Sequence, residues 1–200
     1  SFVDNDIIEF VINNKHKESD LVYGDHIRTP SLKYKKAIDF NNSAQWHTKM
    51  PFSHQALFTK TSLMKQYPFD TRFSICADQD FAFKMSGLGK IFEYIHKPIA
   101  YFDENGLSRS NMFLLCIEGL MISLMYDVSH SYTKESWWYK RLRSYFLIQE
   151  AKQTDDYLLQ LHASVEKVTE VFFLRHPFKK YRLYKDIISI FQGEKNLAMS

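Results

Sequence analysis

Apolar and polar positions in the first half of the chain switch between helical and strand-like spacing. Apolar residues over 7–12 follow Asp4 at helical spacing, which predicts a short helix capped by that aspartate. A compact apolar run at 21–23 predicts a short strand. Thr61 or Ser62 is placed to cap a short helix that ends before Pro68. This alternation predicts an α/β fold.

The pattern continues with one more helix and two more strands. Residues 78–85 are spaced as a helix, and Gly87 and Gly89 follow where a helix usually ends. The apolar runs 91–95 and 99–102 predict two strands on either side of Pro98.

From about residue 109 the pattern becomes helical. Residues 112–117 and 120–126 are apolar on almost every side and are interrupted only by Glu118 and Gly119. Each run is shorter than the roughly 20 apolar residues that span a bilayer, so a buried core helix is expected, with an interfacial segment as the alternative. Helical spacing then recurs over 137–151, 155–174 and 179–191. We therefore expect two regions, residues 1–108 and a helical region 109–200.

Composition and charge are those of an ordinary globular protein. Hydrophobic residues make up 45% of the 200 residues and charged residues 24%. The formal net charge of +3 is too small to indicate nucleic-acid binding, and no nucleic-acid-binding motif accompanies it. Two cysteines are too few for a disulfide framework, and no secretory signal is visible at Ser1, which favours the cytoplasm.

The strongest candidate for a catalytic segment is 76–81, Cys-Ala-Asp-Gln-Asp-Phe. Asp78 and Asp80 stand two residues apart where an aromatic loop becomes a helix. One carboxylate would then face a cleft while the other faces the helix body, an arrangement that suits a general base. The alternative is that Asp78 is simply the N-cap of its helix.

Residues 1 to about 110 resemble the family-2 glycosyltransferases of the GT-A fold, particularly the bacterial enzymes that build surface polysaccharides. The resemblance is carried by short segments that occur in the family's order: 20–25, 54–58, 69–70, 77–81 with Lys84, 94–102 and 105–108. Ala77 departs from the pattern, because many members have Glu at that place.

The resemblance implies an inverting hexosyltransferase that moves a sugar from a nucleotide-sugar donor to a saccharide or lipid-linked acceptor hydroxyl. In this interpretation Asp78 is the catalytic base. The acceptor site takes its other residues from the matching segments: His54, Gln55 and Asp80 shape the pocket or orient Asp78, and Asn105 and Ser108 close its floor.

The resemblance also implies that the family's nucleotide-binding half lies before Ser1, so that the chain is the acceptor-side part of a GT-A (Rossmann-like) domain with a helical appendage. A divalent metal, Mg or Mn, is expected for the complete enzyme, with ligands mostly upstream of Ser1. The chain alone is then a poor catalyst. The alternative is a non-catalytic glycosyltransferase-like module that docks a partner or a membrane surface.

Three further groups of residues can each be interpreted in two ways. Lysines and Arg28 between 28 and 50 either meet a phosphate or acidic sugar or are simply solvated. The basic amphipathic segment 179–191 either makes peripheral contact with anionic lipid at the inner face of the membrane or is a solvated face of a packed helix. Asp25 and His26 either reach a metal or the acceptor or belong to a turn at a strand end.

Overall fold

The structure, a computed structural model, describes residues 1–13, 18–40, 48–71, 73–126, 135–141 and 144. The chain divides into two compact units, Ser1–Leu142 and Arg143–Ser200. The predicted boundary after Ser108 falls inside the first unit. Of the predicted C-terminal helices, residues 137–141 are helical, while 155–174 and 179–191 lie outside the described residues.

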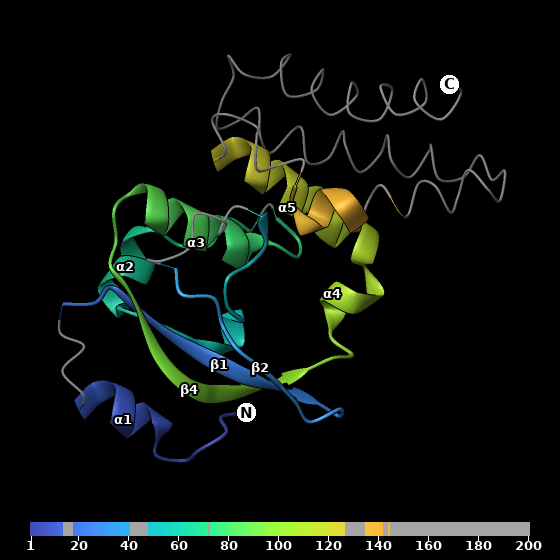
Figure 1. Cartoon of the computed structure of the whole chain (residues 1–200). Coiled ribbons are helices and arrows are strands. Elements are labelled where there is room, and N and C mark those ends of the chain that lie inside the picture. The colour runs from blue at the N-terminus through green and yellow to red at the C-terminus, as the bar shows by residue number, and fades with distance from the viewer. Residues whose placement is uncertain (14–17, 41–47, 72, 127–134, 142–143, 145–200) are drawn as a thin grey trace, which may run out of the picture. The chain divides into compact units, whose positions relative to one another are not determined.

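The first unit is mixed α/β and is built on a four-stranded sheet (Figure 1). Strand β1 (Leu21–Thr29) pairs in parallel with the long strand β4 (Phe92–Asp103) over almost its whole length. The opposite edge of β1 is shared, end to end and antiparallel, by β3 (Leu57–Thr59) and β2 (Lys33–Lys35). The sheet is therefore mixed, and β1 lies at its centre.

The strands differ from the sequence prediction in length and number. The strand predicted at 21–23 continues to Thr29, so Asp25 and His26 lie within a strand and the alternative of a strand-end turn is wrong. The two strands predicted around Pro98 are one strand, β4. The β1–β4 ladder is irregular there, because Tyr23 pairs with Tyr94 but Asp25 already pairs with Pro98. A bulge of this kind accommodates a residue that has no N–H to donate.

Gly24 sits at this irregularity and lies too close to β4 to carry a side chain. A Cβ at Gly24 would be 2.5 Å from the Lys97 carbonyl oxygen and 2.6 Å from the Ile99 side chain. Overpacking of that kind forces the backbone to shift and costs about 1–3 kcal/mol. We expect Gly24→Ala to lower the free energy of unfolding by about 2–3 kcal/mol in chemical denaturation. Gly87→Ala is the control, because a Cβ there meets nothing within 4 Å; a loss of equal size in the control would contradict the close-approach argument.

Four helices predicted in the described part are present: α1 (Ile7–Asn13), α2 (Thr61–Gln66), α3 (Ala77–Gly87) and α5 (Met112–Tyr126). The short helix α4 (Leu107–Ser110) was not predicted. The N-cap of α2 is Lys60, which makes no side-chain cap bond, so the prediction of Thr61 or Ser62 as the cap is wrong. The chain turns away after α3 at Gly89, whose φ of 68° is a left-handed conformation that glycine adopts without strain.

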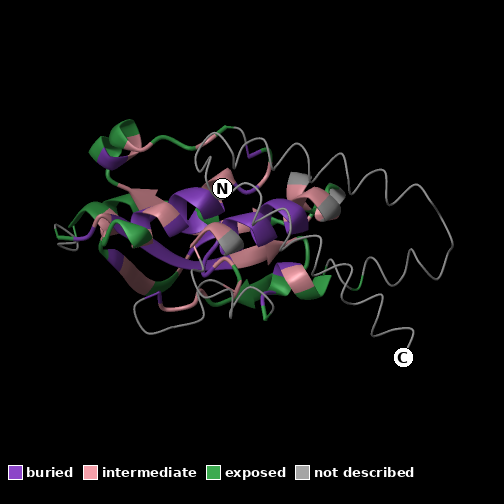
Figure 2. Cartoon of the chain, turned by 90° about the horizontal axis from the view of Figure 1, so that it is seen from above, coloured by how far each residue is buried: buried purple, intermediate pink, exposed green. Residues whose placement is uncertain are grey.

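The buried residues, purple in Figure 2, are concentrated in β1, β4, α3 and the middle of α5. Helix α1 lies on the other side of the sheet from α3 (Figure 1) and places Ile7 in a cluster with Ile99 and Ala100. The middle of α5, from Cys116 to Ser123, is fully buried, which confirms the expectation of a core helix. None of the described helices combines the length and the apolar character that crossing a membrane requires.

Candidate functional site

The first turn of α3 presents Asp78 at the edge of the protein core. The N-cap of α3 is Cys76, so Asp78 is the second helical residue and the N-cap alternative is wrong. Asp78 Oδ1 accepts a hydrogen bond from the Gln79 N–H at 2.9 Å. A negative charge in the first turn is also stabilised by the helix dipole. The carboxylate is thus held at the start of the helix while its side chain stays 24% exposed.

His54 is paired with Asp78 and comes from a different element. It begins the short 3-10 helix η2 (His54–Ala56), which precedes β3. His54 Nδ1 donates to Asp78 Oδ2 across 2.9 Å, and the imidazole remains half exposed. The two residues are 24 positions apart, and the fold brings together two of the residues predicted for the site.

This hydrogen bond raises the pKa of His54 above its ordinary value of 6.5, against a smaller opposite effect of burial. Because its pKa is higher in the folded state, protonated His54 stabilises the fold. This stabilisation is complete at pH values below the unfolded-state pKa, near 6.5, and is lost as the pH rises through the folded-state pKa. We expect His54→Asn to destabilise the protein more at about pH 5.5 than at about pH 9. Urea unfolding at the two pH values measures the difference, and an equal or reversed difference would contradict the ion pair.

Asp80 has a different environment from Asp78, although only one residue separates them. Its side chain is buried, and Asp80 Oδ1 accepts a hydrogen bond from the Tyr126 hydroxyl at 3.2 Å. The burial of Asp80 agrees with the prediction that the second carboxylate faces the helix body, whereas a cleft at Asp78 stays a prediction. Asp80 therefore joins α3 to α5, and its assignment to the acceptor site stays a prediction.

A buried glutamate that the sequence analysis treated only as an interruption of an apolar helix holds the loop before α3. Glu118 of α5 is 1% exposed. Its Oε1 accepts a hydrogen bond from the Ser74 N–H, and its Oε2 accepts bonds from the N–H groups of Ile75 and Cys76, all at 2.9 Å. Glu118 thus fixes three consecutive backbone groups immediately before the helix that carries Asp78.

The neighbouring contacts reinforce this attachment. Gln79 Nε2 donates to the Gly119 carbonyl at 3.3 Å, and Cys76 Sγ donates to the Leu115 carbonyl at 3.5 Å. The Trp138 indole lies so close to Gly119 that a Cβ there would be 2.3 Å from its Nε1. Burial raises the pKa of the Cys76 thiol well above its ordinary value, so Cys76 is a packing residue, as predicted, and not an activated nucleophile.

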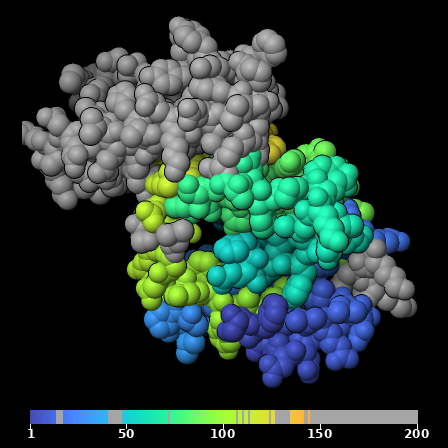
Figure 3. All heavy atoms as spheres, turned by 180° about the vertical axis from the view of Figure 1, so that it is seen from behind, coloured from blue at the N-terminus to red at the C-terminus, as the bar shows by residue number. Residues whose placement is uncertain are grey.

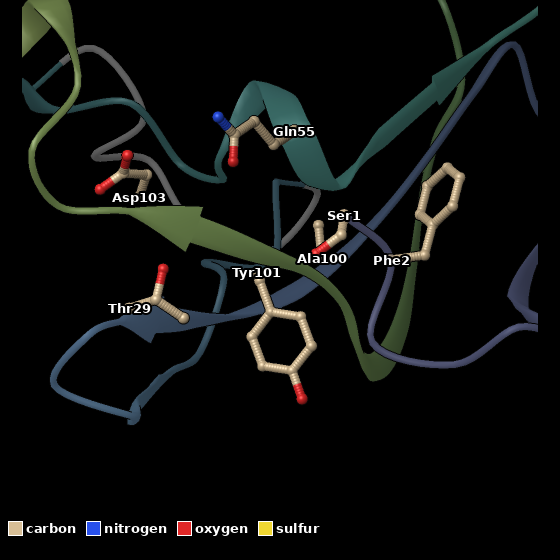
Figure 4. Close-up of a pocket in the computed structure, with 7 residues that line it drawn as sticks. All are labelled: Ser1, Phe2, Thr29, Gln55, Ala100, Tyr101 and Asp103. Carbon is tan, nitrogen blue, oxygen red and sulfur yellow. The ribbon is translucent and has the colours of Figure 1, made fainter.

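Gln55, the residue after His54, lines an open pocket of about 580 Å³ (Figure 4). The remaining lining comes from the N-terminal residues and from the ends of β1 and β4: Ser1, Phe2, Thr29, Ala100, Tyr101 and Asp103. Figure 4 shows the Gln55 and Asp103 side chains above the β4 ribbon and the Tyr101 ring below it. The volume lies in the usual range of ligand pockets, about 300–1,000 Å³.

The last two predicted site residues follow β4. Asn105 lies in the turn after the strand, where its N–H donates to Asp103 Oδ1 at 2.8 Å. Ser108 lies within α4 and is half buried. Asn105 is therefore tied to a residue of the Gln55 pocket through Asp103, whereas the role of both residues as a floor stays a prediction.

Asp25 forms a second buried polar cluster, on β1. Its carboxylate accepts hydrogen bonds from the hydroxyls of Tyr34 and Tyr94, the latter at 2.5 Å, and from the Ala37 N–H at 2.7 Å. The hydrogen bond to Asp25 raises the pKa of Tyr34. Its partners give Asp25 a structural role, which is to hold the segment after β2 against the sheet.

In the described part of the chain, no three His, Cys, Asp or Glu side chains form a group that could hold a metal ion. The expected Mg or Mn, with ligands mostly upstream of Ser1, therefore stays a prediction. Comparison of the chain with protein-family models, with curated proteins and with solved structures found no match.

Proposed function

We propose that the chain contributes the acceptor-side site of an inverting glycosyltransferase, in which Asp78 is the general base. The observation that carries the proposal is the pair formed by Asp78 and His54, 2.9 Å apart and accessible to solvent at the first turn of α3. The resemblance of segments 54–58 and 77–81 to family-2 glycosyltransferases points to the same two residues.

The reaction is a single displacement at the anomeric carbon of a nucleotide sugar. The acceptor hydroxyl attacks this carbon, its proton passes to a carboxylate oxygen of Asp78, and the nucleoside diphosphate leaves with the electron pair of the broken glycosidic bond. Such a base must approach the hydroxyl to about 2.6–3.2 Å, and general-base assistance contributes about 10²–10⁴ in rate. The configuration of the anomeric carbon is inverted.

The environment of Asp78 suits this role. Its two oxygens are oriented by the Gln79 N–H and by His54, and further lone pairs remain for an acceptor hydroxyl. The Gln55 pocket provides amide, hydroxyl and carboxylate groups next to η2, and a saccharide needs such groups for hydrogen bonding. Cell-surface polysaccharide synthesis, with a saccharide or lipid-linked acceptor, is the setting that the resemblance favours.

The test is a transfer assay with the protein in the longest form that its gene encodes. A panel of nucleotide sugars is offered with and without manganese, together with simple saccharide acceptors and lipid-linked acceptors. We expect release of a nucleoside diphosphate that depends on the acceptor, and a product of inverted configuration. Calorimetric titration of the same donors measures binding separately. Absence of both binding and transfer for every donor would contradict the proposal and favour a non-catalytic interaction module.

A further inference from the structure

The hairpin between β1 and β2 carries a fully exposed tip. Every residue of 30–36, Pro-Ser-Leu-Lys-Tyr-Lys-Lys, is exposed. Leu32 is 70% exposed and has a φ of 53°, so its apolar side chain is presented to solvent by the turn itself. The hairpin projects from the sheet on the side away from α2 (Figure 1), and in Figure 3 its blue spheres protrude at the lower left edge.

The same tip is strongly basic. Lys33, Lys35 and Lys36 lie within seven residues that include no acid. Lys33 and Lys35 pair across the ladder with Arg28 and His26, so these side chains share one face of the hairpin. Glu104, after β4, interacts with Arg28 at 3.6 Å and with Ser31. All three lysines are exposed to solvent.

The hairpin is anchored to the sheet by Asp25. The buried carboxylate of Asp25 accepts hydrogen bonds from the hydroxyl of Tyr34, which lies among the lysines, and from the N–H of Ala37, which directly follows them. Tyr94 donates to the same carboxylate and ties this anchor to β4. A tip that is already ordered loses little conformational entropy when it binds a surface.

We propose that this hairpin tip, residues 30–36, docks on the surface of an anionic lipid bilayer, with Leu32 in the interfacial layer and the three lysines on the phosphate head groups. An exposed leucine surrounded by lysines matches a surface that is apolar inside and negative outside. A soluble polyanion would use the lysines but would leave Leu32 in water, so the bilayer accounts for both observations. The inference does not depend on the glycosyltransferase proposal.

The experiment is co-sedimentation of the full chain with vesicles of phosphatidylcholine alone and with vesicles that also contain phosphatidylglycerol. We expect binding to the anionic vesicles only. Replacing Lys33, Lys35 and Lys36 by glutamine should weaken it about a hundredfold, since each lysine near an anionic surface contributes about fivefold. Leu32→Ser should weaken it about tenfold through the lost apolar burial.

Two matched variants provide the controls. Replacement of Lys65, Lys90 and Lys140 by glutamine removes the same charge elsewhere, and Ile12→Ser removes an apolar side chain of similar exposure, 73%, from α1. Neither should weaken binding by more than about twofold.

An environment-sensitive dye on Leu32→Cys tests insertion directly, because the native Cys76 and Cys116 are buried. Its emission should shift to shorter wavelength with anionic vesicles, whereas the same dye on Ile12→Cys should not shift. The proposal is overturned if Leu32→Ser binds like the parent chain. It is also overturned if the hairpin variants keep binding while neutralisation of the basic residues in 179–191 abolishes it.

Discussion

Replacing Asp78 by asparagine is expected to lower sugar transfer by a factor of about 10²–10⁴ while the protein remains folded. Asparagine has the same shape and can still accept the Gln79 N–H, but it cannot take a proton from the acceptor. The free energy of unfolding should therefore change little. The pKa of His54 should fall toward its ordinary value, because the charged partner that raises it is gone.

Initial rates of transfer and an NMR titration of His54 measure the two effects. Asp6→Asn is the matched control, because it removes an exposed carboxylate before α1 and should leave both unchanged. His54→Asn should reduce transfer less than Asp78→Asn does, since His54 orients Asp78 but does not itself accept the proton. Retention of more than about a tenth of the activity in Asp78→Asn would reject Asp78 as the base.

Replacing Glu118 by alanine is expected to lower the free energy of unfolding by about 3–5 kcal/mol. The change removes the acceptor of three backbone N–H groups, and a buried donor without a partner costs about 1–3 kcal/mol. The expected loss is smaller than three full penalties, because Ser74 is exposed and Ile75 is half buried, so water can bond to some of the freed N–H groups. Chemical denaturation followed by circular dichroism measures this change.

Glu118→Gln keeps one carbonyl oxygen toward the loop and should be less destabilising than alanine. Glu135→Ala is the control at an exposed position. The same Glu118 variants should also weaken transfer at temperatures where they remain folded, because the loop that they release leads directly into the helix of Asp78. A loss below about 1 kcal/mol in Glu118→Ala would mean that water replaces the carboxylate readily.

The two predictions concern one assembly, in which α5 holds the loop, the loop starts α3, and α3 presents Asp78. Asp80, two residues after Asp78, accepts a hydrogen bond from Tyr126 at the end of α5. The first turn of α3 is therefore attached to α5 on both sides, through Glu118 before it and through Tyr126 after it. This arrangement explains why two carboxylates with nearly identical sequence context differ in exposure. One is taken into the α3–α5 layer and the other is left at the surface beside His54.

Local patterns along the chain were enough to predict most of the described elements and the different exposure of the two aspartates. Helical spacing and terminal glycines predicted α3, and the apolar run predicted that α5 is a core helix, because both properties depend on residues within one or two turns. The i, i+2 spacing of Asp78 and Asp80 predicted opposite orientations, because side-chain direction on a helix follows from position alone. The family and the reaction stay predictions.

Only the tertiary structure decided the partners of these residues and the extent of the strands. The pairing of His54 with Asp78 and the three bonds to Glu118 join residues 24 to 44 positions apart, and no local spacing specifies which buried groups meet. β1 continues through Gly24 to Thr29 because β4 lies beside it and supplies hydrogen bonds, a condition absent from the sequence of β1 itself. Long-range hydrogen bonding and packing override local preference at those places, whereas helical periodicity needs no distant partner to be recognised.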